Sequence, residues 1–268
     1  MRSLFPRVSA LPSAPAPAAT EAEQFAAHLS ATYQLSAQGN YVFGSPLGPF
    51  YSHQRHGYLH RFVFFGPHAT DDSWRLSFLA GFDRRDLRAS RALLALIETL
   101  ADQVEDGHGL NLTFFPQVDA AAAPANAAPR LLDQAHWSRS AAPEIDLLEK
   151  DARLRGYHGF VRLETTTAED DLITLRVREP AGLEESPDVE LISTEETGAY
   201  PVRFERAAGP AVADGPLTIA EDLPVQPFEL TLRIPAAWPE TRYRAAAVTI
   251  LSRFIRRYRA FQAYGQHL

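Results

Sequence analysis

The feature that most constrains the fold is the alternation of short apolar runs with longer segments of helical periodicity. The apolar runs at 61–66, 75–81 and 109–116 are bounded by turn residues, which is typical of buried β-strands. Between the second and third runs, apolar residues recur at helical spacing from about 86 to 104. We therefore expect an α/β protein, because strands that alternate with helices build a sheet with helices on both faces.

The remaining segments continue this pattern. Thr20 is the expected N-cap of a short amphipathic helix over 21–34, and the stretch from 39 to 60 predicts turns and short strands. Further along, the sequence predicts a helix over 142–156, strands over 157–166, 172–179, 200–205 and 227–235, and a final helix from Pro239 to about Ala263. We see no internal repeat and no second boundary, so we expect a flexible leader over 1–20 and one domain over 21–268.

Composition excludes several classes of function. The 268 residues carry a net charge of -7, which gives no general reason to bind nucleic acid. The absence of cysteine excludes thiolate catalysis and disulfides and fits a reducing compartment. No apolar stretch approaches the ~20 residues that a membrane span requires. We expect a cytoplasmic protein with neither a nucleic-acid nor a membrane partner.

Four stretches, taken together, resemble the zinc carboxypeptidases, including the succinylglutamate desuccinylase/aspartoacylase-like group. They are "FLAGFDRRD", "AHWSRSAAPE", "GFVRLETT" and "FELTLRIP", and their order and spacing hold from roughly residue 40 to the C-terminus. The resemblance implies a three-layer α/β/α fold with a central mixed, mostly parallel sheet, of the phosphorylase/hydrolase-like kind. In such sheets, sites gather at the carboxyl ends of the strands.

Carried over position by position, the resemblance implies that the metal site is degenerate. Asp83 and Asp86 stand where the family has the His and Glu of its first metal-binding motif. Glu164 stands at the third ligand, a His in the family, and Arg233 stands at the general-base Glu. The family's zinc is held by two imidazoles and a carboxylate, and its Glu deprotonates a bound water.

The same resemblance implies a candidate site for a substrate carboxylate. The family's Asn-Arg pair corresponds to Ser138 and Arg139, and the family's arginine contacts the carboxylate of the substrate. Arg130 lies upstream in the same long segment, so two cations could converge on one anion. We expect weak binding of a peptide or small carboxylate near the mouth of the cleft and none at the former metal position.

The replacements change the chemistry that this site supports. An all-carboxylate set suits magnesium, calcium or manganese better than zinc. The guanidinium of Arg233 cannot act as a base near neutral pH; it repels a divalent cation and pairs readily with carboxylates. We therefore expect a pseudoenzyme without a cofactor, in which Arg233 pairs with at least one of Asp83, Asp86 and Glu164.

Three alternatives remain open. The chain is alternatively an active carboxypeptidase or N-acyl amino acid deacylase that uses Asp83, Asp86 and Glu164 on a harder divalent metal. In the second alternative, Asp83 and Asp86 are ordinary acids at the N-terminus of a helix, where the helix dipole favours negative charge. We expect Arg84 and Arg85, which lie between them, to be solvated. A third, weaker possibility is a scaffold that assembles through its last helix.

The histidines offer no clear relocated metal site. The group of His53, His56 and His60 and the pair of His68 with Asp71 lie in turn-rich segments, where histidine is more often a surface residue than a ligand.

Overall fold

The computed structural model describes residues 20–39, 41–52, 55–84, 87–120, 142–167, 171–178, 200–206 and 227–265. Its core is an eight-stranded mixed sheet in the order β1-β4-β6-β5-β7-β10-β8-β9. The strands are β1 (Val42–Gly44), β4 (Phe62–Phe65), β5 (Trp74–Leu79), β6 (Leu110–Phe115), β7 (Gly159–Thr166), β8 (Ile173–Arg178), β9 (Val202–Arg206) and β10 (Phe228–Pro235). A separate two-stranded sheet is formed by β2 (Leu47–Ser52) and β3 (Arg55–Leu59).

The centre of the sheet is parallel. Strands β6, β5, β7 and β10 are neighbours, and all three pairings among them are parallel. On the flanks, β1 and β4 run antiparallel to their neighbours, β8 is antiparallel to β10, and β9 is parallel to β8. The carboxyl ends of the four central strands therefore meet at one edge of the sheet, which we call the carboxyl edge.

The described helices are α1 (Glu21–Ala37), α2 (Arg88–Asp102), the short 3-10 helix η1 (Val104–Gly107), α4 (Pro143–Arg155) and α5 (Glu240–Gly265). Two helix ends have the caps that the sequence predicted. Thr20 and Glu23 form a reciprocal capping box at the start of α1. Gly156 closes α4 in the left-handed conformation, with φ of 60°. None of the described helices has the length and apolar character that crossing a membrane would require.

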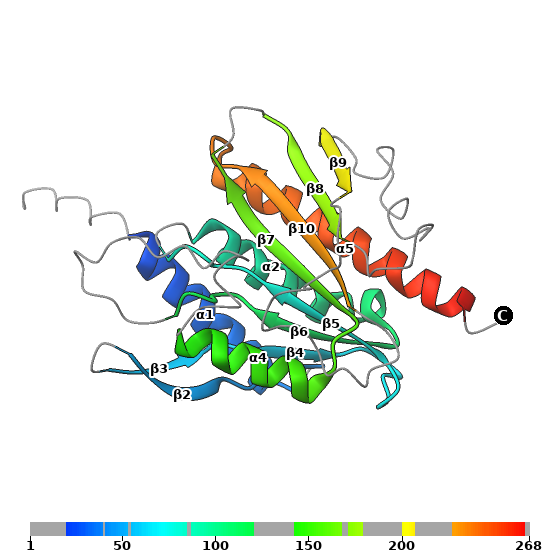
Figure 1. Cartoon of the computed structure of the whole chain (residues 1–268), viewed down its shortest axis with the longest axis horizontal. Coiled ribbons are helices and arrows are strands. Elements are labelled where there is room, and N and C mark those ends of the chain that lie inside the picture. Colours follow the sequence, from blue (N-terminus) through cyan, green and yellow to red (C-terminus); the bar gives the residue numbers. More distant parts are fainter. Residues whose placement is uncertain are drawn as a thin grey trace, which may run out of the picture.

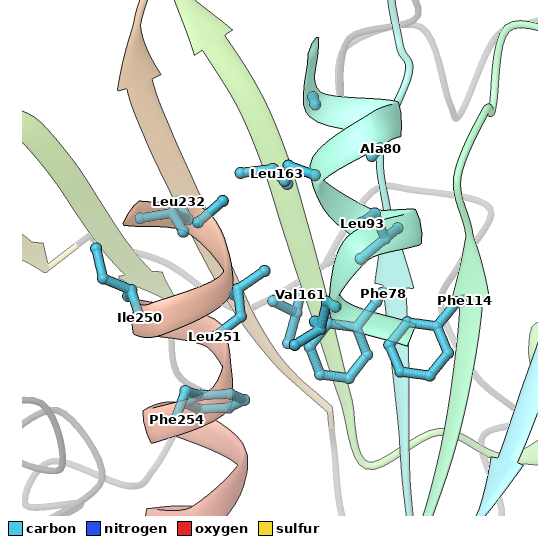
Figure 2. Packing of buried hydrophobic residues seen from close by; sticks show 14 of the residues in the cluster. Phe78, Ala80, Leu93, Phe114, Val161, Leu163, Leu232, Ile250, Leu251 and Phe254 are labelled. Carbon is cyan, nitrogen blue, oxygen red and sulfur yellow. The ribbon is translucent and has the colours of Figure 1, made fainter. Parts of the chain in front are cut away.

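One face of the sheet packs on α2 and α5. Figure 2 shows Leu232, Leu251 and Phe254 where α5 meets the sheet, and Phe78 and Phe114 near α2. Along β7 and β10, every second side chain enters this core: Val161 and Leu163, then Leu230, Leu232 and Ile234. These side chains are at most 3% exposed, so hydrophobic burial holds the two helices to the sheet.

The opposite face has a smaller apolar cover, made by α4 and the β2–β3 hairpin (Figure 1). Its core, which we call the α4 cluster, contains Leu79, Phe115 and Phe160 from the sheet and Ile145 and Leu148 from α4. Helices thus lie on both faces, and the expected three-layer α/β/α architecture with a mixed, mostly parallel sheet is confirmed.

The side chains of β7 and β10 that face away from α2 and α5 are mostly polar. The polar ones include Arg162 and Glu164 on β7 and Glu229, Thr231 and Arg233 on β10, whereas Phe160 of β7 belongs to the α4 cluster. A parallel strand that is packed on both faces normally reads as a continuous apolar run. The alternation along these strands therefore identifies a part of the sheet that is built differently from the α4 cluster.

Candidate functional site

The turn that follows β5 is held against the turn that follows β6. Backbone hydrogen bonds run from Ala80 N to Phe115 O at 3.0 Å and from Asp119 N to Gly81 O at 2.9 Å. Gly81 has φ of 67°, and a side chain there would lie 2.8 Å from the carbonyl oxygen of Pro116, so only glycine fits. These contacts fix the segment that carries Asp83 at the carboxyl edge.

Arg84 is a structural residue of this turn. Its Nε lies 2.8 Å from Asp119 Oδ2 and its Nη2 lies 2.5 Å from Asp119 Oδ1, a two-point ion pair with a fully buried carboxylate. The expectation that Arg84 is simply solvated was wrong, because the next parallel strand ends beside it and supplies a partner. Sequence analysis missed Asp119, although its position in the turn that follows an apolar strand was a usable signal.

Asp83 lies in the same turn but not at the start of a helix. Helix α2 begins at Arg88, with Leu87 as its N-cap, and its first turn contains no acidic residue. Asp83 is partly buried five positions before the helix. The interpretation of Asp83 as an ordinary helix-dipole acid is therefore wrong; Asp86 and Arg85 lie outside the described residues.

Glu164 and Arg233 belong to a grid of side chains on four adjacent strands. The pairing of β7, β10, β8 and β9 places residues side by side in three rows that face away from α2 and α5. The first row is Glu164, Arg233, Thr174 and Arg203; the second is Arg162, Thr231, Arg176 and Glu205; the third is Phe160, Glu229 and Arg178. The charges of this grid come from strands far apart in the sequence and converge because the sheet aligns them.

Five of these side chains form a continuous chain of ion pairs, which we call the charged cluster. Arg233 Nε lies 3.1 Å from Glu164 Oε2, and Arg162 Nη2 lies 2.8 Å from Glu164 Oε1. Arg162 Nη1 lies 3.1 Å from Glu229 Oε1, and Arg178 Nη1 lies 3.5 Å from Glu229 Oε2. The expectation that Arg233 pairs with one of the three acids is confirmed by its contact with Glu164.

Burial decreases along the charged cluster toward the carboxyl edge. The side chains of Arg162 and Glu229 are 7% exposed, that of Glu164 is 20% exposed and that of Arg233 is 38% exposed. The guanidinium of Arg162 also lies over the ring of Phe82, 4.6 Å from its centroid. The buried centre of the cluster is thus tied to the turn that carries Asp83, and its most exposed member is Arg233 at the end nearest the carboxyl edge.

The described part of this arrangement does not fit a zinc ion. Each oxygen of Glu164 accepts from an arginine, and the adjacent Arg233 places a positive charge beside any cation at that position. Within the described ranges, no three histidine, aspartate or glutamate side chains are grouped so as to hold a metal ion. Asp86, the remaining acid of the expected set, lies outside these ranges.

A second buried ion-pair group lies under α4 and has a structural role. Asp151 of α4 accepts from Arg61 and from the hydroxyl of Tyr157, the latter at 2.6 Å, while Arg61 also donates to the carbonyl of Ser45 at 2.9 Å. Burial, followed by the charge of Asp151, raises the pKa of Tyr157 well above its usual value. This group joins α4 to the edge of β4 and to the entrance of β7.

The histidines that we considered are in unrelated contacts. The ring of His60 lies 3.0 Å from the hydroxyl of Tyr33, and burial lowers the pKa of His60. His68 packs on His108, with ring centroids 4.9 Å apart. His53 lies outside the described residues, as do the three residues expected to bind a carboxylate, Arg130, Ser138 and Arg139.

The fold is similar to that of known metallopeptidases. A metallo-carboxypeptidase from Burkholderia cenocepacia superposes with a TM-score of 0.63 at 16% identity over 91% of this chain and 70% of that one. A provisionally assigned metallopeptidase from Shewanella denitrificans gives 0.58 at 14% identity, over 88% of this chain and 89% of the other. A metallo-carboxypeptidase from Pseudomonas aeruginosa gives 0.56 at 16% identity over 87% and 68%.

No family model matches the sequence, and no curated protein matches it either. At these identities the structural comparisons establish a zinc-carboxypeptidase-like fold. Any activity has to be argued from the residues of this chain.

Proposed function

We propose that this chain is a non-catalytic protein with a zinc-carboxypeptidase-like fold, in which an ion-pair cluster has replaced the metal site. The observation that carries the proposal is the contact of Arg233 Nε with Glu164 Oε2 at 3.1 Å. The two residues occupy neighbouring positions on β10 and β7, and by resemblance they correspond to the general base and to the third metal ligand. A base and a ligand have thus become an ion pair.

The proposal follows from the chemistry of the two side chains. A guanidinium stays protonated at any physiological pH, so Arg233 cannot deprotonate a water molecule. Loss of a general base alone lowers the rate by roughly 10²–10⁴-fold. A metal bound beside Arg233 would also compete with both arginines for Glu164. We therefore expect no measurable carboxypeptidase or deacylase activity.

We further propose that the cleft keeps a role in binding a peptide or small carboxylate, with Arg139 as the residue that recognises it. Arginine and carboxylate form planar two-point contacts that are among the stronger polar interactions in proteins. Thermal shift measurements with C-terminal dipeptides and N-acyl amino acids, repeated on Arg139→Ala, test this part. Equal responses of the two proteins, or no response to any carboxylate, would contradict the assignment.

The experiment for the main proposal combines metal content with turnover. Protein purified without chelator is analysed for zinc, magnesium, calcium and manganese, and is then assayed on peptides and N-acyl amino acids with each metal added. We expect no stoichiometric metal and no metal-dependent turnover. A stoichiometric metal that is lost in Asp83→Ala, together with turnover, would instead support an active hydrolase with carboxylate ligands.

A further inference from the structure

The chain has one long stretch without charge. Aspartate, glutamate, lysine and arginine make up 22% of the sequence, yet none of them occurs between residues 24 and 54. This stretch contains α1 after its first turn, followed by β1 and β2. The outer side of a helix that faces water normally carries charged side chains. The missing charges therefore identify a part of the surface that differs from an ordinary solvated one.

Helices α1 and α4 show the difference directly. The exposed positions of α1 after its first turn hold small or amide side chains, including Ala26, Ala27, Ser30, Ala31 and Gln34. On α4, in contrast, ion pairs at the surface join Lys150 to Asp146 and Arg153 to Glu149. Such pairs, four positions apart, are typical of a helix side that faces water. The small side chains of α1 instead leave this helix open to the close approach of another protein surface.

Exposed aromatic side chains lie on the strands beside α1 and on the hairpin that follows. Among the described residues, six large hydrophobic side chains are exposed, and five of them are the aromatic residues Tyr41, Phe43, Tyr51, Tyr58 and Phe65. The rings of Phe43 on β1 and Phe65 on β4 contact each other, with centroids 5.7 Å apart. Exposed apolar patches mark interaction sites, and the core of a protein–protein interface is rich in aromatic residues and poor in charge.

Close packing joins α1 to the strand that carries Phe43. A side chain at Gly44 would lie 2.8 Å from the ring of Tyr33 and 2.9 Å from the hydroxyl oxygen of Ser36, so α1 is seated directly on β1. Strand β1 is the last strand at this end of the sheet, and α1 and the exposed aromatic rings lie around it. We call the exposed side chains of α1 from 24 to 37, together with Tyr41, Phe43 and Phe65, the uncharged surface.

We infer that the uncharged surface is the contact between two copies of this chain. The choice of a second copy rests on charge. With a net charge of -7, two copies repel each other wherever their acidic surfaces meet. A two-fold axis brings the same patch of each copy against itself, so the patch has to be compatible with its own composition. An uncharged aromatic surface meets this condition, whereas a docking site for an acidic or basic partner would carry the opposite charge.

The last helix, as far as its side chains are described, offers no comparable surface. Assembly through this helix was the third alternative from the sequence, but Ile250, Leu251 and Phe254 of α5 are at most 4% exposed and pack on the sheet. Their apolar area is already used within one chain. The uncharged surface lies at the β1 end of the sheet, away from the charged cluster, so the inference does not rest on the proposed loss of the metal.

Sedimentation velocity of the full chain over a concentration series tests the inference. Phe43→Glu places an acid among the aromatic rings, and Ala31→Glu places one on the outer side of α1; both positions are exposed. Leu154→Glu is the matched control, because it puts the same acid at an exposed apolar residue of α4, outside the uncharged surface. Circular dichroism and thermal unfolding verify that each variant is folded.

We expect the wild type and Leu154→Glu to form a dimer with the same dissociation constant. Phe43→Glu and Ala31→Glu should each raise this constant by roughly a hundredfold, because the dimer then holds two new carboxylates in a contact without a counter-charge. If Phe43→Glu fails to fold, Ala31→Glu decides alone, since an exposed helix position tolerates glutamate. A wild type that stays monomeric at every concentration, or a dimer that both variants leave unchanged, would overturn the inference.

Discussion

Two neighbouring parts of one sheet face are built on different principles. Under α4, the side chains of Leu79, Phe115 and Phe160 form an apolar cluster that is at most 2% exposed. Further along β7, Arg162 and Glu164 occupy the same face as Phe160 and pair with Glu229 and Arg233 of β10. The side chains of the α4 cluster are stabilised by apolar burial alone, whereas every member of the charged cluster depends on an oppositely charged neighbour.

The difference indicates why the charges are there. Buried ion pairs are rarely better for stability than apolar residues of similar volume, because desolvation offsets most of the attraction. Stability alone would therefore favour apolar residues, like those of the α4 cluster, at the charged positions of β7 and β10. Charged side chains at the carboxyl edge of a metallopeptidase-like sheet are what the proposed replacement of a metal site by an ion-pair cluster predicts.

Removing the central cation of the charged cluster should have the largest effect. Arg162→Ala leaves two carboxylates without their shared partner and exposes the ring of Phe82, so we expect a loss of about 3–5 kcal/mol in the free energy of unfolding. Denaturant titration measures it. Arg153→Ala is the control, because that exposed arginine of α4 pairs, among the residues the structure describes, with Glu149 alone and should cost less than about 1 kcal/mol. Equal losses in the two variants would remove the distinction between buried and surface pairs.

Truncation in the α4 cluster should be nearly as costly, for a different reason. Leu79→Ala creates a cavity in an apolar core where the side chain is 1% exposed, so we expect a loss of about 2–5 kcal/mol. The same denaturant titration applies, with Leu154→Ala as the control because that leucine is 84% exposed.

The exposed end of the charged cluster should contribute much less to stability. Arg233 is 38% exposed, and Glu164 keeps Arg162 as a partner when Arg233 is removed. We expect Arg233→Ala to lower the free energy of unfolding by roughly 1 kcal/mol or less. A loss as large as that of Arg162→Ala would mean that Arg233 is as important for stability as the buried arginine of the cluster.

The smallest effect is expected at the start of β7, where His158 lies directly before the strand. Burial, followed by the charge of Arg75, lowers the pKa of His158, and Arg75 N donates to its Nδ1 at 3.0 Å. Its folded pKa therefore lies below its unfolded pKa of about 6.5, so its contribution is complete above that pH and is lost as the pH falls.

His158→Asn retains an acceptor but does not titrate in this range. Its stability should therefore decline less than that of wild type between pH 7 and pH 5 in paired denaturant titrations. Parallel declines would show that His158 is not the group responsible.

The sequence was informative where local rules decide the outcome. Thr20, Pro143 and Gly156 mark helix ends by their own chemistry, and the apolar runs became the central strands. The contact of Arg233 with Glu164 was also predictable, because the resemblance aligned two strands that lie side by side. Arg162 and Glu229 were missed as site residues, since nothing local shows that their strands are neighbours or which face is apolar.

Other parts of the site depended on contacts between distant turns. Arg84 resembles a solvated arginine in the sequence, and only the convergence of the turns after β5 and β6 brings Asp119 to it. The charged cluster likewise depends on the register of β7, β10 and β8, which is a long-range property of the sheet. Arg130, Ser138, Arg139 and Asp86 remain predictions.

The central claim is that Arg233 and Glu164 form an ion pair where a zinc carboxypeptidase would hold its metal. X-ray diffraction from crystals soaked in a zinc salt, recorded on both sides of the zinc absorption edge, tests it most directly. We predict no anomalous peak between Glu164 and Asp83, with Arg233 still in contact with Glu164. A peak about 2.0–2.2 Å from a Glu164 oxygen, with the guanidinium of Arg233 displaced, would contradict the account.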